Sequence, residues 1–203
     1  AVLRVPEVPF TFGGAARYNV QNALGAMLVA HELGGNVESM RRTLAVFGQE
    51  ATDNPGRLGV HTRGDVRIVV DYAHNDDGVA AVVPALMTLP ARRRLALISQ
   101  AGDRSDEDNQ RMAAAILRLQ PAEVMIAELP GYERQRAPGE TSESIARGFE
   151  AEGLPRDRIH FASRPGEGAR RLIEGAQPGD LVCLFLHADR AEVEAFLKET
   201  PGV

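Results

Sequence analysis

Four polar side chains follow directly after a short apolar run in the first half of the chain. The run is Ile68 to Val70, and the side chains after it are Asp71, Tyr72, His74 and Asn75. A buried strand of an α/β sheet presents such residues at its carboxyl end, where these sheets bind ligands. A carboxylate, a phenol, an imidazole and an amide suit the ring and ribose hydroxyls of a nucleotide. We interpret the stretch as a nucleotide-binding segment; the competing interpretation is that Asp71 only caps the next helix.

A second polar segment, Gln100 to Asp108, follows another apolar run. Its Ser105 and Asp108 have the spacing of a helix capping box. Asp103 and Arg104 come just before them and are candidates for binding the charged groups of a substrate. They equally suit pairing with each other or capping the next helix, and the residues alone leave this open.

A third polar segment, Glu128 to Glu140, is longer than the usual connection between a strand and a helix. It contains Arg134, Arg136 and Glu140. If it faces the strand ends, the arginines and carboxylates form a pocket for an amino acid's carboxylate and amine. If it faces away, the arginines form a solvated basic patch. The sequence does not decide the direction of this loop.

The apolar periodicity places these segments in an α/β sheet. Segments 58–62 and 66–71 form a predicted β-hairpin, after which strands alternate with helices. The predicted strands are 94–99, 123–127, 158–161 and 180–186, and the predicted helices are 77–86, 106–119, 141–151, 165–174 and 190–198. Such alternation indicates right-handed βαβ units. We therefore predict a Rossmann-like, mostly parallel sheet with one antiparallel edge strand.

Two helices without strands of their own come before this sheet. Apolar residues recur at helical spacing over 20–33, and a second helix over 37–47 begins at Asn36 as its N-cap. The turn-rich segment 53–57 then marks a domain boundary. We predict a helical part at residues 1–54 and a sheet domain at residues 55–203.

The composition argues against several classes of protein. The net charge of −5 disfavours non-specific nucleic-acid binding. Cys183 is the single cysteine, so disulfides are excluded and a reducing cytoplasm fits. No apolar run approaches the roughly 20 residues of a membrane span. We expect neither a nucleic-acid nor a membrane partner.

The sequence also lacks two kinds of site. Besides His74, the histidines have scattered spacing that predicts no metal site, and we expect them to be structural or solvent-facing: His31, His61, His160 and His187. Lys198 is the only lysine, and no Gly-x-x-x-x-Gly-Lys-Ser/Thr loop occurs. The chain therefore cannot assemble a standard P-loop ATP site by itself, and we predict no catalytic residue within it.

The order of these motifs resembles the C-terminal part of the Mur ligase superfamily of ATP-dependent, ADP-forming amide ligases. The resemblance rests on three segments: 18–24, 55–57 and 71–75. Four further segments are most similar to the cyanophycin synthetase branch: 10–14, 102–108, 134–140 and 178–182. Where the superfamily often has proline after Asn75, this chain has Asp76 and Asp77. We expect Asp76 to cap the following helix; the alternative is that the two carboxylates alter nucleotide affinity or substrate preference.

The resemblance implies a domain architecture. Residues 1–54 would be the last helices of the central ATPase domain, which in this family carries the P-loop, the magnesium ligands and a modified lysine. Residues 55–203 would be the C-terminal domain, which closes over ATP and brings the incoming amino acid. ATP and Mg²⁺ are thus the implied cofactors, with the magnesium ligands mostly outside this chain. The rest of the ligase chain is the implied partner, a homo-oligomer remains open, and the chain alone is expected to be inactive.

The resemblance also implies roles for the polar residues. Arg57 and Asp71 would contact the ribose or phosphates of ATP, and Tyr72, His74 and Asn75 would line the adenine side. The implied site for the incoming amino acid consists of Asp103, Arg104, Arg134, Arg136 and Glu140. In the implied reaction a carboxylate and ATP form an acyl-phosphate, and an amine then displaces phosphate to give an amide.

Two other functions remain open on the sequence. One is a non-catalytic Rossmann-like module that binds a nucleotide or another protein. The other is a ligase of the same superfamily that acts on a peptidoglycan or folyl acceptor. The segment from Arg134 to Glu140 favours the cyanophycin-synthetase-like function over this second alternative.

Overall fold

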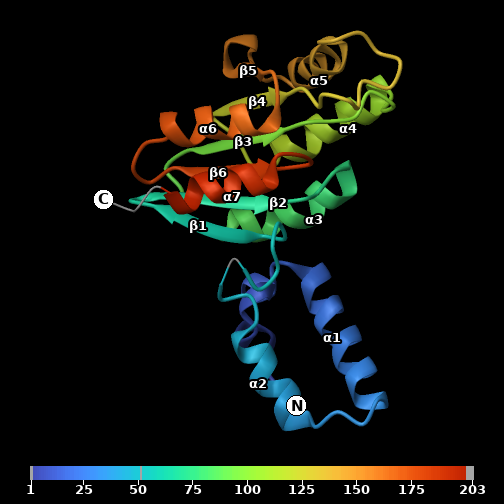
Figure 1. The fold of residues 1–203 in the computed structure, drawn as a ribbon, viewed down its shortest axis with the longest axis vertical. Helices are drawn as coiled ribbons and strands as arrows, with labels where there is room; N and C mark the ends of the chain where they lie inside the picture. The colour runs from blue at the N-terminus through green and yellow to red at the C-terminus, as the bar shows by residue number, and fades with distance from the viewer. Residues whose placement is uncertain (1, 51, 200–203) are drawn as a thin grey trace.

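A six-stranded sheet forms the centre of the computed structural model, which describes residues 2–50 and 52–199 (Figure 1). The strands are β1 (Gly59–Arg63), β2 (Val66–Asp71), β3 (Arg94–Ile98), β4 (Glu123–Ala127), β5 (Ile159–Ala162) and β6 (Leu181–Phe185). Their spatial order is β1-β2-β6-β3-β4-β5, and β1 pairs antiparallel with β2 while the other neighbours pair in parallel. The predicted mostly parallel sheet with one antiparallel edge strand is confirmed.

Helices cover both faces of the sheet. One face carries α3 (Asp76–Met87), α4 (Asp106–Leu117) and α5 (Glu140–Ala151), and the other carries α6 (Pro165–Gly175) and α7 (Arg190–Glu199). Successive side chains of a strand point to opposite faces, so Val69 and Cys183 pack under α3 to α5, whereas Ile68 and Val182 pack under α6 and α7. Burial on both faces explains why the strands read as continuous apolar runs.

Five further helices complete the described secondary structure. They are α1 (Arg17–Glu32), α2 (Val37–Val46) and the short 3-10 helices η1 (Val5–Glu7), η2 (Pro9–Gly14) and η3 (Arg156–Arg158). In Figure 1 the pair α1 and α2 projects beyond the β1 edge of the sheet. Within the described part of the chain, no helix is both long and apolar enough to cross a membrane.

The helical pair has an incomplete core. The predicted N-cap is confirmed, because Asn36 Oδ1 accepts hydrogen bonds from the backbone N–H groups of Glu38 and Ser39. Leu24 and Leu28 of α1 are 52% and 66% exposed, so the apolar stripe of this helix is only partly covered by the described residues. Ala1, Ala51 and residues 200–203 of the two predicted domains lie outside the described residues.

The position of β6 creates the crevice where polar residues gather. Although β6 is the last strand in sequence, it lies between β2 and β3. The chain leaves β2 toward α3 on one face and leaves β6 toward α7 on the other. Ligands bind to open α/β sheets at such switch points, just beyond the carboxyl ends of the strands.

Candidate functional site

Asp71 organises the start of the candidate site. It ends β2 and is buried, and its two carboxylate oxygens accept hydrogen bonds of 2.8 Å from the backbone N–H groups of Leu58 and Ala73. Burial raises the pKa of this carboxyl, while those hydrogen bonds and the nearby charge of Arg57 oppose the rise. Asp71 therefore fixes the backbone beside Arg57 and at the end of β2, and it does not cap α3.

Asn75 caps α3 instead of the expected Asp76. Asn75 Oδ1 accepts a hydrogen bond of 2.7 Å from the backbone N–H of Gly78, and Asp76 is the first residue of the helix. The Asp76 carboxylate accepts a hydrogen bond from Arg111 Nε on α4 at 3.2 Å. The expectation for Asp76 is thus wrong, because the side chain with the required extended backbone lies one residue earlier.

One cavity brings together four of the five residues predicted to bind ATP. It has a volume of about 270 Å³, and its polar lining includes Arg57, Asp71, His74 and Asn75. Tyr18 of α1 adds an aromatic ring that the prediction did not include. An aromatic ring, an arginine and hydrogen-bond acceptors are the groups that suit a nucleoside phosphate.

The fifth residue, Tyr72, lies on the other side of His74. It lines a second cavity of about 170 Å³, to which His74 also contributes, beside Gln100, Ala101, Arg104, Leu129, Tyr132 and His187. The Arg57 guanidinium lies 5.1 Å from the centre of the Tyr72 ring. His74 lines both cavities, and the Arg57–Tyr72 contact joins a lining residue of each, so the two cavities are adjacent.

His187 is a residue of this site that the sequence analysis missed. His187 is partly buried. Its Nε2 lies 2.9 Å from the carbonyl oxygen of Ala73, and its Nδ1 lies 3.2 Å from Ser99 Oγ. A carbonyl oxygen only accepts, so Nε2 carries a proton, and in the neutral ring Nδ1 accepts from Ser99. Burial lowers the pKa of His187, which favours this neutral form. Its place directly after an apolar strand, like that of Asp71, was the available signal.

The residues predicted to bind the incoming amino acid divide into two groups. In the described part of the chain, the side chains of Asp103 and Arg104 are exposed and have no hydrogen-bond or ion-pair partner. Arg134 is also exposed, and its guanidinium lies 5.2 Å from the centre of the Tyr132 ring. These three side chains are therefore accessible to a ligand.

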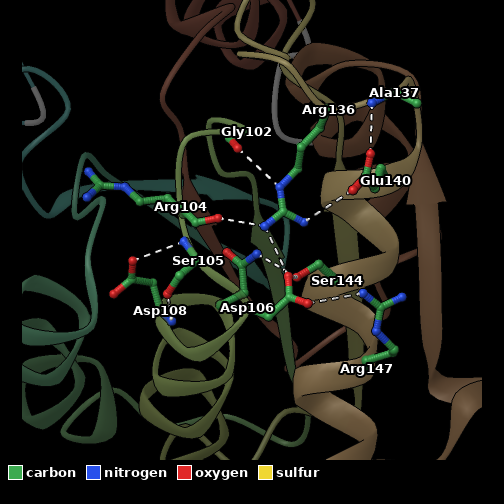
Figure 2. Close-up of polar contacts among 11 residues, drawn as sticks. Gly102, Arg104, Ser105, Asp106, Asp108, Arg136, Ala137, Glu140, Ser144 and Arg147 are labelled. Atoms are coloured by element: carbon green, nitrogen blue, oxygen red, sulfur yellow. Dashed lines mark hydrogen bonds and ion pairs between the residues drawn. The ribbon is translucent and has the colours of Figure 1, made fainter.

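Arg136 and Glu140 form the second group and bond within the protein. Arg136 donates to the carbonyl oxygens of Gly102 and Arg104 and to Asp106 (Figure 2). The Glu140 carboxylate accepts from the backbone N–H of Ala137 at 2.9 Å. The loop after β4 thus faces the strand ends and contacts the loop after β3, which the sequence left undecided.

The capping box at the start of α4 is present. Ser105 Oγ accepts from the backbone N–H of Asp108, and the Asp108 carboxylate accepts from that of Ser105, both at 3.1 Å. Among the described residues, no three side chains of His, Cys, Asp or Glu are placed to hold a metal ion.

Comparison with known proteins identifies the family of this sheet. The family model of the Mur ligase, glutamate ligase domain, matches residues 56–185. The chain belongs to this family, which confirms the resemblance found in the sequence.

Two curated relatives cover most of the chain. A cyanophycin synthetase of Crocosphaera subtropica is 33% identical over 186 residues, which are 90% of this chain and 21% of that protein. The UDP-N-acetylmuramoyl-L-alanyl-D-glutamate–2,6-diaminopimelate ligase of Pseudomonas aeruginosa is 32% identical over 181 residues, which are 88% of this chain and 35% of that protein. The chain thus spans about a fifth to a third of the length of these ligases.

Solved structures share the fold. FolC of Escherichia coli, determined in complex with ADP, matches with a TM-score of 0.65 and 20% identity over 88% of this chain and 39% of that chain. The ligase MurC of Thermotoga maritima matches with a TM-score of 0.63 and 15% identity over 90% of this chain and 37% of that chain.

Proposed function

We propose that this chain is the C-terminal portion of an ATP-dependent, ADP-forming amide ligase similar to cyanophycin synthetase. Residues 1–54 would form the last helices of its central ATPase domain, and residues 55–203 its C-terminal domain. The observation that carries the proposal is the pair of cavities that meet at His74. One has groups suited to a nucleotide, and the other is lined by Arg104, whose side chain makes no hydrogen bond or ion pair among the described residues.

The first cavity is proposed to bind ATP. Arg57 would contact its phosphates or ribose, and the backbone held by Asp71 would keep that arginine in place. His74, Asn75 and Tyr18 would lie beside the nucleotide, whereas Tyr72 would lie between the two ligands. FolC and a MurF ligase of the same fold were solved in complex with ADP, which supports the use of ATP by this kind of ligase.

The second cavity is proposed to bind the incoming amino acid. Arg104, which lines this cavity, would pair with its carboxylate. Asp103 and Arg134 do not line the cavity and would contact the part of the amino acid that extends beyond it. A carboxylate of the acceptor would attack the γ-phosphorus of ATP and release ADP, which gives an acyl-phosphate. The amine of the bound amino acid would then attack the acyl carbon, lose a proton and displace phosphate to form the amide.

The contribution of these residues would be to position the reactants. Holding an amine close to an acyl-phosphate replaces a bimolecular encounter with an oriented one, which lowers the barrier substantially. The P-loop, the magnesium ligands and the modified lysine expected for this family would belong to other parts of the ligase. We therefore expect the chain alone to bind nucleotide without catalysing amide formation.

The test is ADP release by the full-length protein with ATP, magnesium and a panel of amino acids. The panel includes aspartate and arginine together with a short primer that contains both residues. Release that requires one amino acid and the primer supports the proposal and identifies the substrate. Release that requires a peptidoglycan or folyl acceptor instead retains the ligase but refutes its similarity in function to cyanophycin synthetase.

A non-catalytic nucleotide-binding module is the second candidate. The feature that favours it is that the given sequence contains no Gly-x-x-x-x-Gly-Lys-Ser/Thr loop, while the cavity lined by Arg57, His74 and Asn75 is present. Nucleotide binding without ADP release under any of these conditions would support this candidate. Loss of ADP release on replacement of Arg104 by alanine would contradict it.

A further inference from the structure

We infer that Arg136 is a positioning residue that clamps the loop after β4 to the loop after β3 and thereby orients Arg104 toward the incoming amino acid. This inference rests on the proposed function and refines the role of Arg136 in the same site. Its alternative is that Arg136 itself pairs with the substrate. The contacts of Arg136, Gly102, Asp106 and Arg104 favour the positioning role over direct binding.

The Arg136 guanidinium spans two loops and a helix start. Its Nε donates to the Gly102 carbonyl oxygen at 3.1 Å, and Nη2 donates to the Arg104 carbonyl oxygen at 2.8 Å and to Asp106 Oδ1 at 3.0 Å. The side chain is only 18% exposed. A planar guanidinium can hold acceptors in several directions at once, whereas the compact ammonium of lysine cannot span them.

Gly102 brings the two loops into direct backbone contact. Its N–H donates to the carbonyl oxygen of Tyr132 at 2.9 Å. A Cβ atom at position 102 would lie 1.9 Å from the carbonyl oxygen of Glu133, so a larger residue would force the loops apart. The clamp therefore has a second contact that does not involve the side chain of Arg136.

Asp106 holds the clamp to the helices. Its carboxylate accepts from Ser144 Oγ at 2.6 Å and from Arg136, and Arg147 lies 3.5 Å away. Hydrogen bonds from Ser144 and Arg136 hold the pKa of the Asp106 carboxyl below its usual value, so it stays ionised near neutral pH. Arg136 therefore already has an anionic partner, which reduces its need for the carboxylate of a ligand.

The backbone before Arg136 is strained. Arg134 and Gln135 have φ angles of 51° and 80°. These angles lie in the left-handed region, which residues other than glycine seldom adopt. Such a conformation persists only where surrounding contacts impose it. The bonds of Arg136 and of Gly102 are the contacts that hold this loop against the loop after β3.

The clamp binds the backbone of Arg104 and leaves its side chain available to a ligand. Arg136 bonds to its carbonyl oxygen, while its side chain extends away from Arg136 in Figure 2. That side chain lines the cavity formed by Tyr72, His74, Tyr132 and His187. Fixing the backbone of a long side chain narrows the positions that its guanidinium can reach, which favours one binding geometry.

The test replaces Arg136 by lysine in the full-length ligase, with Arg147→Lys as the matched control. Arg147 also contacts Asp106, and among the described residues it makes no hydrogen bond or ion pair with either loop. Without substrates, Arg136→Lys should speed hydrogen exchange at the Gly102 amide by about tenfold or more, because local opening governs that exchange. Arg147→Lys should leave the exchange unchanged within about twofold, the scatter expected for a surface replacement.

Kinetics provide the second measurement. Arg136→Lys should raise KM for the amino acid by about tenfold and change KM for ATP by less than about twofold, and Gly102→Ala should reproduce both effects. A raised KM for the amino acid with unchanged Gly102 exchange would overturn the inference and make Arg136 a direct ligand. Absence of amino-acid-dependent ADP release in the unmodified protein would refute the proposed function, whereas the exchange measurement would still decide whether the clamp exists.

Discussion

Single residues at the carboxyl end of the sheet connect strands that are distant in sequence. His187 follows β6 and reaches Ala73 after β2 and Ser99 after β3. Asp71 likewise connects the end of β2 to Leu58 before β1. The shape of the site therefore depends on a few buried polar contacts, and each of them can be tested by one replacement.

His187 should make the stability of the protein depend on pH. The pKa of His187 is lowered in the folded state, so the unfolded state binds more protons as the pH drops below about 6.5. The free energy of unfolding therefore decreases as the pH is lowered. His187→Gln should lower that free energy by about 1–3 kcal/mol at pH 7.5 and reduce its decline between pH 7 and 5. Urea denaturation at several pH values measures both effects. His31→Gln, on the exposed surface of α1, is the control; an equal effect there would contradict the assignment.

Asp71 should contribute to stability as well as to nucleotide binding. Asp71→Asn places an amide N–H₂ against one of two buried backbone N–H donors, so we expect a loss of about 1–3 kcal/mol in unfolding free energy. Thermal denaturation with and without ATP measures the loss and any stabilisation by nucleotide. Asp65→Asn, in the exposed hairpin turn, should change neither the melting temperature nor the stabilisation by ATP. An unchanged melting temperature in Asp71→Asn would show that these contacts contribute little.

Elements of the fold pack closely where glycine allows it. Gly148 of α5 faces the backbone of α4, and a Cβ atom there would lie 3.0 Å from Gln110 Cα. Backbone atoms cannot rotate away as side chains do, so the two helices must separate to admit a methyl group. This contact holds the later part of α5 against α4.

Gly148→Ala should therefore destabilise the protein by about 1–3 kcal/mol, in spite of the higher helix propensity of alanine. Gly25→Ala in α1 is the matched control, since no atom lies within 4 Å of its new Cβ. The control should stabilise the chain by about 0.5–1 kcal/mol. Chemical denaturation measures the free energy of unfolding of both variants, and an unchanged m-value shows that a shifted midpoint reports stability alone. Stabilisation by both replacements would mean that α4 and α5 pack less tightly than described.

Local sequence patterns predicted the elements well, and the exceptions are informative. The predicted strand 123–127 matches β4, and the predicted helix 106–119 overlaps α4. The cap of α3 was misplaced by one residue because Asn75 and Asp76 are both good capping residues. Only the backbone conformation distinguishes them, and it depends on how the chain leaves β2.

The whole molecule consists of the covered sheet and the projecting helical pair. The two are connected by Ala16, which is fully buried, and by Tyr18, which packs against the core under α3. Exposed apolar side chains on α1, such as Leu28 and Val29, contrast with the closed core of the sheet. This contrast supports the proposed domain boundary near residue 54.

A shortened chain of residues 54–203 should fold cooperatively. All six strands and the helices α3 to α7 lie within it, so we expect one denaturation transition and retained α/β circular dichroism. Loss of the contacts of Ala16 and Tyr18 should lower its stability by about 1–3 kcal/mol relative to the longer chain. A non-cooperative transition would refute the boundary and make α1 part of the same folding unit.

The sequence by itself determined the elements, the α/β class and the segments that carry the polar residues. Hydrophobic periodicity and capping residues act over a few positions, so they can be recognised without the rest of the chain. For the same reason the sequence correctly placed Asp71 at the end of a strand and Arg104 after one.

The tertiary structure decided which of these segments meet. The insertion of β6 between β2 and β3 brought His187 into the site, and the approach of two loops at Gly102 turned Arg136 inward. Strand order and loop direction result from packing between residues far apart in sequence, and local patterns do not record that packing. The physical reason is that a buried polar group must find its partner in space, whatever the distance along the chain.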